Sequence, residues 1–426
     1  MDSVTLMSRA LRSSPPSNTR MIALTLTLLA ALTATPTRAV TLAEAVTGAL
    51  QVEQQESRVA ALRGESAAIR RQAGGLLAAD PALRAKSVSD ALTGNDGAYE
   101  LEAMVDLPLW MPGQRSASQG IATAMGNQAD ALVRLLRWEM AGRVREAAWT
   151  TALAQGRLRQ AAAALAAARS LEQDIGKRTM AGELARMDLL VAQQDTLTRE
   201  VDLQAAQLDY NQAIQSYIHL TGLRTVPEPL VETAPPPSGT PTEAHADLPA
   251  DHPLLASSDG AVAKARAERE RVHSQRRGNP LLSLGAKRVR DGRGSEAADA
   301  LQLEISVPFG LTSYSAPAIA LAERAYTEEV TTRRRTLIEA EHALETARIE
   351  VAGATEALAL ATRRQTVTQD AVQLVRRAFN LGESELTTLL QAQERARQAS
   401  LDLELRRLEQ GRAAARLNQA LGLVPE

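Results

Sequence analysis

The stretch Ala181–Gln193, AGELARMDLLVAQ, recurs 200 residues later as Leu381–Gln393, LGESELTTLLQAQ. Six of the thirteen paired positions are identical, and the alignment needs no gap. Two further pairs of segments keep the same offset: Leu107-Pro108-Leu109 with Val307-Pro308-Phe309, and Gly222-Leu223 with Gly422-Leu423. This interval is too long for a solenoid unit, which has about 20–50 residues. We therefore predict a duplicated half-molecule built around a pseudo-symmetry axis.

The composition favours long helices over large globular cores. Aromatic residues make up 2% of the chain, so Leu, Ala and Val must supply nearly all of the buried surface. Abundant Ala, Leu, Glu, Gln and Arg is typical of long, closely packed helices. A net charge of −2 gives no electrostatic basis for binding nucleic acid, so no such partner is expected. The absence of cysteine excludes disulfides and a cysteine-linked lipid anchor.

The first 39 residues have the order of an export signal. Three arginines precede an apolar run, Met21–Ala34, and Thr37-Arg38-Ala39 offers a cleavage site between small residues. The run is too short for a permanent membrane-spanning helix. We predict a signal peptide, residues 1–39, with cleavage after Ala39; the alternative is a buried N-terminal helix.

Proline marks the boundaries between the predicted domains. No proline occurs between Pro112 and Pro227 or between Pro317 and Pro425, and a proline inside a helix costs about 3 kcal/mol. The segment from about 113 to 175 could therefore form one helix, on the order of 95 Å long. Prolines crowd residues 227–253, which we interpret as a linker between a first repeat, 40–226, and a second repeat, 254–426.

Apolar residues at helical spacing predict one packing seam in each half. In the first half they are Leu190, Leu197, Val201, Ala205 and Leu208. The positions 200 residues later are Leu390, Arg397, Leu401, Leu405 and Leu408, of which only Arg397 is not apolar. Leu389 is also placed in the seam. Gly182 and Gly382 are expected to end the long helices at two tips, near 176–188 and 378–388.

Two segments alternate apolar and polar residues, which predicts strands with one apolar face. They are Tyr99–Leu107 and Leu301–Val307, and each completes a hairpin, about 81–110 and 280–310. A soluble sheet capping the helices is one interpretation. Transmembrane strands of about 10 residues are the other. Four strands cannot close a barrel, because the smallest barrels use about eight, so a barrel requires several chains.

An exported, duplicated chain with long helices and one strand hairpin per half resembles the TolC family of outer-membrane channels. The most specific marks are the strand exits Leu107-Pro108-Leu109-Trp110 and Val307-Pro308-Phe309-Gly310, with the tip motifs beginning at Gly182 and Gly382. The segment Trp110–Arg115 is closest to the CzcC-like branch, which serves heavy-metal efflux systems. The resemblance covers about Val40 to Glu426.

The resemblance implies a mainly α fold with a small β part: a coiled-coil tunnel of long helices, and two β-hairpins per chain that form a shared twelve-stranded transmembrane barrel in a homotrimer. Such a chain lies in the bacterial outer membrane, surrounded by its lipid, with the helices in the periplasm. Its partners are a periplasmic adaptor, or membrane fusion protein, and an inner-membrane RND-type transporter. The function implied is a passive exit duct, with metal cations as the first candidate cargo.

The resemblance also implies functional positions at the tips. Family members carry acidic residues six and nine positions after the second tip glycine, where they ring the constriction. Here those positions are Thr388 and Gln391, and the first-half equivalent of Thr388 is Asp188. Glu383, Glu385 and Glu394 are nearby acids that could supply charge instead. The docking tips for the adaptor are expected at Gly182, Glu183, Leu184, Gly382, Glu383 and Leu386.

No catalytic or cofactor-binding pattern occurs in the sequence, so no enzyme, cofactor or resident metal is predicted. The five histidines have no metal-ligand spacing and are interpreted as surface or linker residues. A multidrug or type I secretion duct of the same fold is an alternative function. A soluble periplasmic coiled-coil scaffold is a further alternative, although a scaffold has no need of strands with an apolar face.

Overall fold

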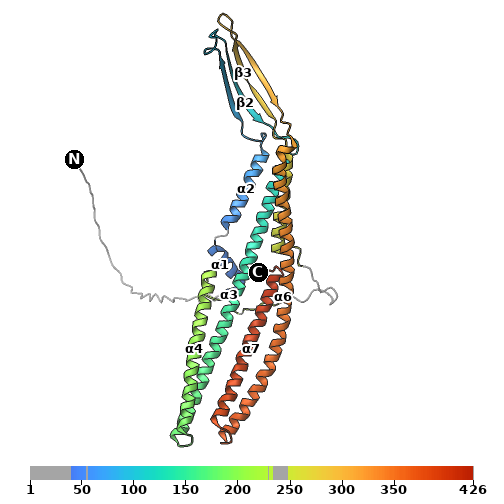
Figure 1. The fold of residues 1–426 in the computed structure, drawn as a ribbon. Helices are drawn as coiled ribbons and strands as arrows, with labels where there is room; N and C mark the ends of the chain where they lie inside the picture. The colour runs from blue at the N-terminus through green and yellow to red at the C-terminus, as the bar shows by residue number, and fades with distance from the viewer. Residues whose placement is uncertain (1–39, 54–55, 229, 234–247, 426) are drawn as a thin grey trace, which may run out of the picture. The chain divides into compact units, whose positions relative to one another are not determined.

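The computed structural model describes residues 40–53, 56–228, 230–233 and 248–425, so the predicted signal peptide and the centre of the linker lie outside the described residues. Eleven helices and strands follow one another in these residues (Figure 1). They are α1 Leu42–Glu53, α2 Glu56–Gly74, β1 Ala82–Ser89, β2 Tyr99–Pro108, α3 Gln114–Met180, α4 Arg186–Thr221, α5 Pro253–Gln275, β3 Leu281–Arg290, β4 Ala298–Ser306, α6 Thr312–Asn380 and α7 Leu386–Ala420.

The duplication predicted from the sequence is confirmed. From α2 onward, each half runs helix, two strands, a very long helix and a shorter helix. The predicted rod at about 113–175 is α3, with 67 residues, and its counterpart α6 has 69. At 1.5 Å per residue each is about 100 Å long. No helix in the described part of the chain combines the length and apolar character needed to cross a membrane.

The two predicted hairpins pair with each other to form one antiparallel sheet in the order β1-β2-β3-β4. In its register Val105 is opposite Leu284, and Leu284 is opposite Leu303, so apolar residues of both halves share one face. The other face is charged: Arg84 ion-pairs with Asp106 at 3.2 Å, and Lys86 with Glu100 at 3.1 Å. β1 and β4 are edge strands, each with a neighbour on one side only.

Met104 is an apolar residue on the charged face of β2. Its side chain is 1% exposed and lies in hydrogen-bonding range of Arg84, whose Nη2 is 3.5 Å from the Met104 Sδ. Gly285 is its register partner, and a Cβ there would clash with Met104 and with the Ala103 carbonyl oxygen. The missing side chain at position 285 therefore makes the space that Met104 fills.

The long helices pack in the lateral order α4-α3-α7-α6, since α3 contacts both α4 and α7, and α7 contacts α6. Small residues allow close approach between the two halves. A methyl group at Gly411 of α7 would clash with the Trp149 ring of α3, and one at Gly156 would lie 3.0 Å from Leu408. The alanine-rich composition thus permits helix packing without large apolar side chains.

The seam predicted for α4 is wrong for the single chain. Leu190, Leu197, Val201 and Leu208 are 51%, 62%, 66% and 57% exposed. The residues of α4 that pack within the chain include Ala192, Thr196 and Ala206, which helical geometry places on the opposite side. The periodicity identified an apolar stripe correctly, but the stripe does not pack against another helix of the same chain. In α7 the equivalent positions are half-buried, and Leu389 is 1% exposed, as predicted.

A buried ion pair holds the start of the linker against the helices. Arg145 of α3 and Glu232 approach to 3.0 Å, with side chains 6% and 10% exposed. Arg145 also donates to the Leu423 carbonyl oxygen at 2.8 Å, and Asn418 donates to Glu232 at 3.1 Å. Removing one partner of such a pair costs about 3–5 kcal/mol, because the other charge is left buried. The linker and the C-terminal end of α7 are therefore fixed to α3 by the same charges.

His252 is a linker residue, as expected, but its burial was not predicted from the sequence. It lies in the predicted linker, but it is 2% exposed and packs edge-on against Trp138, with ring centroids 5.5 Å apart. Its Nδ1 accepts from the Leu254 N–H at 3.2 Å and so caps the first turn of α5. Burial lowers the pKa of His252 below the usual value of about 6.5.

This lowered pKa predicts a loss of stability in acid. The neutral ring contributes stability that is fully present above the unfolded pKa of about 6.5 and is lost as pH falls through the lower folded pKa. His252→Asn keeps a capping acceptor without a titrating group, so its melting temperature should fall less between pH 7.5 and 5 than that of the wild type. His342→Asn, at an exposed position of α6, is the control and should leave the wild-type slope unchanged. Equal slopes in all three proteins would contradict the prediction.

Candidate channel constriction and docking tips

The two predicted tips have the same backbone geometry. Gly182 and Gly382 have φ angles of 78° and 76°, the left-handed conformation that glycine adopts without strain. The N–H of Glu183 donates to the Arg178 carbonyl oxygen at 2.9 Å, and that of Glu383 donates to the Ala378 carbonyl oxygen at 2.9 Å. Both long helices therefore end in the same hydrogen-bonded turn, as the repeated motif predicted.

The first residues after the two turns differ in chemistry. Asp188 accepts from the Ala185 N–H at 3.2 Å, which caps α4 and favours negative charge at the positive end of its dipole. Thr388 occupies the equivalent position in α7 and is exposed, as is Gln391. Asp188 thus has a local structural role, whereas Thr388 and Gln391 leave their side chains accessible.

An apolar cluster joins the two tips. Ile175 and Ala192 of the first half pack with Phe379, Leu386 and Leu389 of the second. The cluster bears on the predicted docking residues, because Leu386 is only 3% exposed and offers no surface to a partner in this conformation. Gly182, Glu183, Gly382 and Glu383 are exposed, and Leu184 is half-buried.

A cation–π contact reinforces this junction. The Arg178 guanidinium lies 5.0 Å from the centroid of the Phe379 ring and also pairs with Glu183 at 3.3 Å. One basic residue at the end of α3 therefore contacts both its own turn and the other tip.

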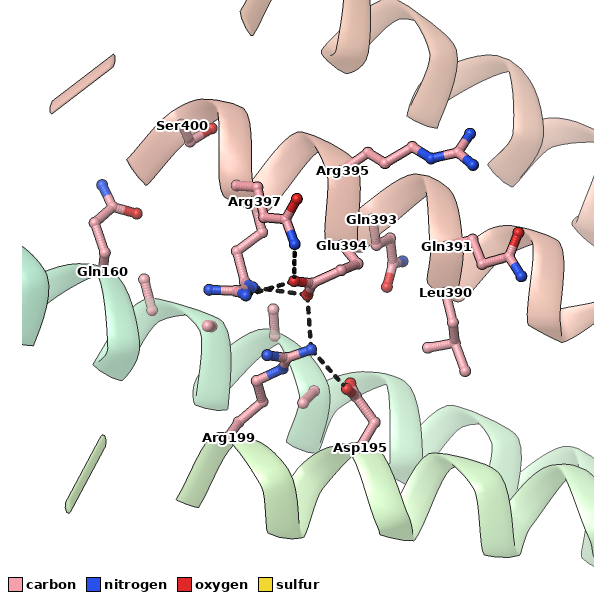
Figure 2. Close-up of a pocket in the computed structure, with 15 residues that line it drawn as sticks. Gln160, Asp195, Arg199, Leu390, Gln391, Gln393, Glu394, Arg395, Arg397 and Ser400 are labelled. Atoms are coloured by element: carbon pink, nitrogen blue, oxygen red, sulfur yellow. Dashed lines mark hydrogen bonds and ion pairs between the residues drawn. The ribbon is translucent and has the colours of Figure 1, made fainter. Parts of the chain in front are cut away.

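A groove of about 690 Å³ lies beside the tips, between α3, α4 and α7 (Figure 2). Its alanine residues, Ala163, Ala164, Ala167 and Ala168, come from α3, while α4 and α7 contribute charged and amide side chains. Gln391 lines this groove, whereas Asp188 and Thr388 do not. Of the predicted constriction residues, the structure brings only Gln391 to this site.

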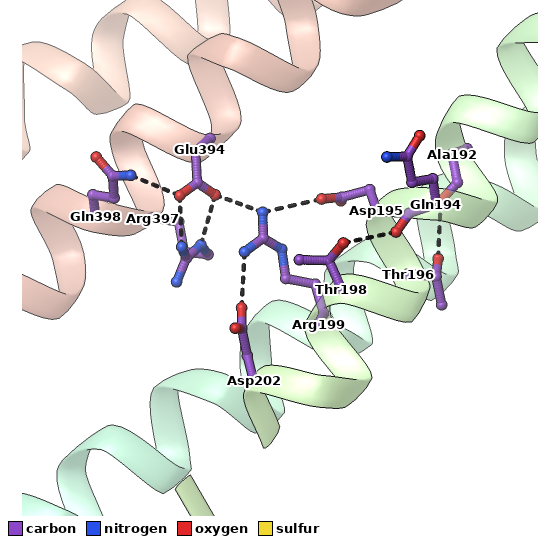
Figure 3. Close-up of polar contacts among 10 residues, drawn as sticks. All are labelled: Ala192, Gln194, Asp195, Thr196, Thr198, Arg199, Asp202, Glu394, Arg397 and Gln398. Atoms are coloured by element: carbon purple, nitrogen blue, oxygen red, sulfur yellow. Dashed lines mark hydrogen bonds and ion pairs between the residues drawn. The ribbon is translucent and has the colours of Figure 1, made fainter. Parts of the chain in front are cut away.

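Arg199 connects α4 to α7 across the groove (Figure 3). Its Nη2 lies 3.0 Å from Asp195 on the same helix and 2.7 Å from Glu394 on α7. Nη1 of the same guanidinium pairs with Asp202 at 3.0 Å. α4 and α7 each pack on α3, so this ion pair joins the two helices that lie on either side of α3.

Glu394 is held ionised by its surroundings. Arg397, Arg199 and Gln398 all donate to its carboxylate, and the hydrogen bond from Arg397 is the largest cause of its lowered pKa. Glu394 was considered as a free acid that could charge the constriction; its charge is instead balanced by two arginines. Arg397, the exception in the predicted seam, is explained by the same pairing, because its guanidinium binds Glu394 at 2.6 Å.

The ion-pair network was not predicted from the sequence. Arg199 and Glu394 are 195 residues apart, and neither lies in a recognisable motif. The only signal was the charge at Arg397 within an otherwise apolar stripe. Among the residues that the structure describes, no group of three or more histidine, aspartate or glutamate side chains could hold a metal ion.

The network predicts unequal effects for its two central residues. Arg199→Gln leaves Asp195 and Asp202 near each other without their cation. Glu394→Gln removes the carboxylate of Arg397 but leaves Arg199 paired with both aspartates. Arg199→Gln should therefore lower the melting temperature more. A double-mutant cycle for Arg199 and Glu394 should give a coupling of about 1 kcal/mol, as expected for a partly exposed pair. A coupling of zero would show that the contact contributes nothing to joining α4 and α7.

Comparison with solved structures identifies the fold. The chain superposes on a membrane protein from Pseudomonas aeruginosa with a TM-score of 0.69 and 16% identity, covering 90% of each chain. It matches the outer membrane protein VceC from Vibrio cholerae, with a TM-score of 0.67, 16% identity and coverage of 89% and 96%. It also matches CusC, a protein that forms a transmembrane channel, with a TM-score of 0.67, 15% identity and coverage of 90% and 92%. Neither a protein-family model nor a curated protein sequence matches the chain. The chain has the fold of these membrane proteins over nearly its whole length.

Proposed function

We propose that this protein is a TolC-like outer-membrane channel that acts as a homotrimer and serves as the passive exit duct of a tripartite efflux pump. The shared fold with VceC and CusC supports this function, as do the strand and tip motifs of the sequence. An inner-membrane RND-type transporter would supply the energy, and a periplasmic adaptor would join the two. The channel itself would carry out no chemical step and would need no cofactor.

The four-stranded sheet is the observation that carries this proposal. Both edge strands, β1 and β4, have unpaired backbone groups along one side, which in a lipid bilayer cost several kcal/mol each. The apolar face is unusually exposed in the single chain: Leu83, Leu301, Leu303 and Ile305 are 78%, 94%, 66% and 65% exposed. Three copies would pair β4 with the next β1, close a twelve-stranded barrel and turn these side chains toward lipid.

The helices have matching unpartnered edges. α4 carries the exposed stripe of Leu190, Leu197, Val201 and Leu208, and α6 carries a second one at seven-residue spacing. The residues of the α6 stripe are Leu360, Val367 and Leu374, which are 55%, 68% and 61% exposed. Because α4 and α6 are the two lateral ends of the helix order, α4 of one copy can pack against α6 of the next. The same threefold arrangement that closes the sheet would thus bury both stripes.

Metal cations are the cargo that we propose first, because Trp110–Arg115 and Val307–Gly310 resemble the CzcC-like branch. A multidrug or protein-secretion duct would use the same fold. The alternative of a soluble scaffold leaves the exposed apolar strand face without a purpose.

Assembly is the first test of the proposed function. Extraction of the protein from membranes should require detergent and yield trimers by native mass spectrometry. Val201→Glu and Val367→Glu place charge in the two stripes and should each favour monomers. Thr198→Glu, at an exposed position beside the α4 stripe, should leave the trimer intact. A monodisperse soluble monomer for the unmodified chain would rule the channel out.

The constriction is proposed at Thr388 and Gln391, which are exposed on α7, with Asp188 on α4 as the first-half position. Thr388→Asp or Gln391→Asp should raise cation preference in planar bilayers, because threefold symmetry places three charges in one ring. The effect should shrink with salt, since screening acts over about 8–10 Å near physiological ionic strength. Leu389→Asp is the control: that side chain is 1% exposed, so the change should destabilise the tip without altering selectivity. Unchanged selectivity in both variants would move the constriction to Asp188 or Glu385.

The tips are proposed to dock the adaptor, because the same turn occurs twice per chain and six times in a trimer. Met180 and Leu381, beside the two glycines, are 83% and 74% exposed and offer apolar surface next to Glu183 and Glu383.

Valine substitutions at the tip glycines test the docking proposal. Gly182→Val and Gly382→Val should disrupt the turns, because the left-handed conformation costs about 1–2 kcal/mol for residues with a Cβ. Adaptor co-purification and export should fall while the trimer persists. Asparagine at the same positions tolerates this backbone conformation and should retain most of the binding. Parallel loss of trimer and export in the valine variants would assign the glycines to folding instead.

A further inference from the structure

A groove of about 450 Å³ lies where the second half of the sheet meets the helices. Its walls come from the last turns of α5 and from the chain that leads out of β4 into α6. Arg271, Gln275 and Arg276 line one side, and Leu311, Tyr314 and Ala318 line the other. The groove therefore combines guanidinium groups, a phenol and aliphatic surface in one place.

The positive charge of this groove is only partly balanced. Arg271 is paired with Glu268 and donates to Gln275 at 2.8 Å, so its charge is accounted for. Arg276, which lines the groove, and Arg277, which follows it outside the lining, are both exposed. No carboxylate among the described residues lies within ion-pair distance of either one. Two cations thus remain at the end of α5 without a described counter-charge.

The backbone of the β4–α6 junction rests directly on these two arginines. A Cβ on Gly310 would lie 2.6 Å from the Arg276 carbonyl oxygen and 3.3 Å from the Arg277 Cα. The close approach is possible only because position 310 is glycine, and it keeps the arginine pair beside the exit of β4.

The exit of β4 is strongly apolar. Val307, Phe309, Leu311 and Tyr314 are 57%, 90%, 60% and 84% exposed. They continue the exposed strand face formed by Leu303 and Ile305. Aromatic residues next to basic ones at the end of an apolar band are typical of the interface between membrane and water.

The first half lacks this arrangement. Its junction arginine, Arg115, donates to the carbonyl oxygens of Ala73 and Gly74, both at 2.8 Å, and so caps the end of α2. The position 200 residues later is Ser315, which carries no positive charge. Leu76 and Leu77 occupy the positions equivalent to Arg276 and Arg277, so this arginine pair beside the strand exit belongs to the second half.

We propose that this groove binds the headgroup of an anionic phospholipid, with the phosphate held by Arg276 and Arg277 and the acyl chains lying along Phe309, Leu311 and the apolar face of β4. Guanidinium groups match phosphate geometry with paired hydrogen bonds, and basic pockets at the membrane surface select anionic lipids. The inference rests on the proposed function, since it requires the sheet to lie in a membrane. The two unbalanced guanidiniums favour a lipid phosphate over a purely apolar surface of a neighbouring copy.

Native mass spectrometry of the detergent-solubilised trimer, titrated with phosphatidylglycerol or phosphatidylethanolamine, tests this proposal. The wild type should bind phosphatidylglycerol preferentially, at up to three molecules per trimer. Each basic residue contributes about fivefold to binding an anionic membrane surface, so Arg276→Gln with Arg277→Gln should weaken phosphatidylglycerol binding roughly 30-fold. Binding of phosphatidylethanolamine should change little.

Matched variants separate this site from general charge effects. Arg334→Gln with Arg335→Gln removes an exposed arginine pair from α6 outside the groove and should leave lipid binding unchanged. Arg276→Lys with Arg277→Lys keeps the charge and should retain most of the preference. If the double glutamine variant does not assemble, Arg276→Gln alone should still lose about fivefold.

Equal binding of the two lipids by wild-type trimers would overturn the proposal, as would unchanged phosphatidylglycerol binding in the glutamine variants. Either result would leave the channel function intact, because the trimer itself is observed in the same spectra. A chain that forms no detergent-dependent trimer would instead contradict the proposed function.

Discussion

The structure depends on backbone groups and apolar surfaces that one chain cannot satisfy by itself. The sheet ends in two open strands, β1 and β4, and the helix order ends in two helices with exposed stripes, α4 and α6. In both layers one edge comes from the first repeat and the other from the second. Duplication has therefore produced a chain with two complementary sides. In the proposed trimer, closure through further copies would remove the open edges, which a membrane-embedded sheet cannot leave unpaired.

Small side chains leave room between the helices, so that polar contacts can form where larger apolar side chains would otherwise fill the space. Because alanines of α3 line the groove between α4 and α7, Arg199 can reach Glu394 across it. Likewise, Trp149 fits against Gly411, where any side chain would clash. Ion pairs between the two halves then help to fix the register in which their helices pack. The buried pair Arg145–Glu232 does the same for the linker, because neither charge can move without leaving the other unpaired.

The sequence predicted the local structure well because its signals are local. Proline spacing located α3 and most of α6, although α6 begins at Thr312 and contains Pro317 in its second turn. The glycine of each tip set a left-handed turn, and period-two alternation found the hairpins. The prediction from sequence failed where the environment of a residue depends on which distant surface it packs against. The stripe from Leu190 to Leu208 has the same periodicity whether it packs within the chain or between chains. The burial of His252 and the pairing of Glu394 depend on residues far away in sequence, Trp138 and Arg199, which no periodicity connects.

Comparison of the two halves separates what the fold requires from what has been free to change. Gly182 and Gly382 keep the same backbone angle, and Leu189 and Leu389 both contribute to the tip cluster. Charged side chains differ between the halves: Asp188 corresponds to Thr388, Arg115 to Ser315, and Leu197 to Arg397. In each of these pairs the charged member has a specific partner, whether a helix end or a carboxylate. The duplicated backbone therefore sets a common frame, and the differences in charge give each half its own contacts within that frame.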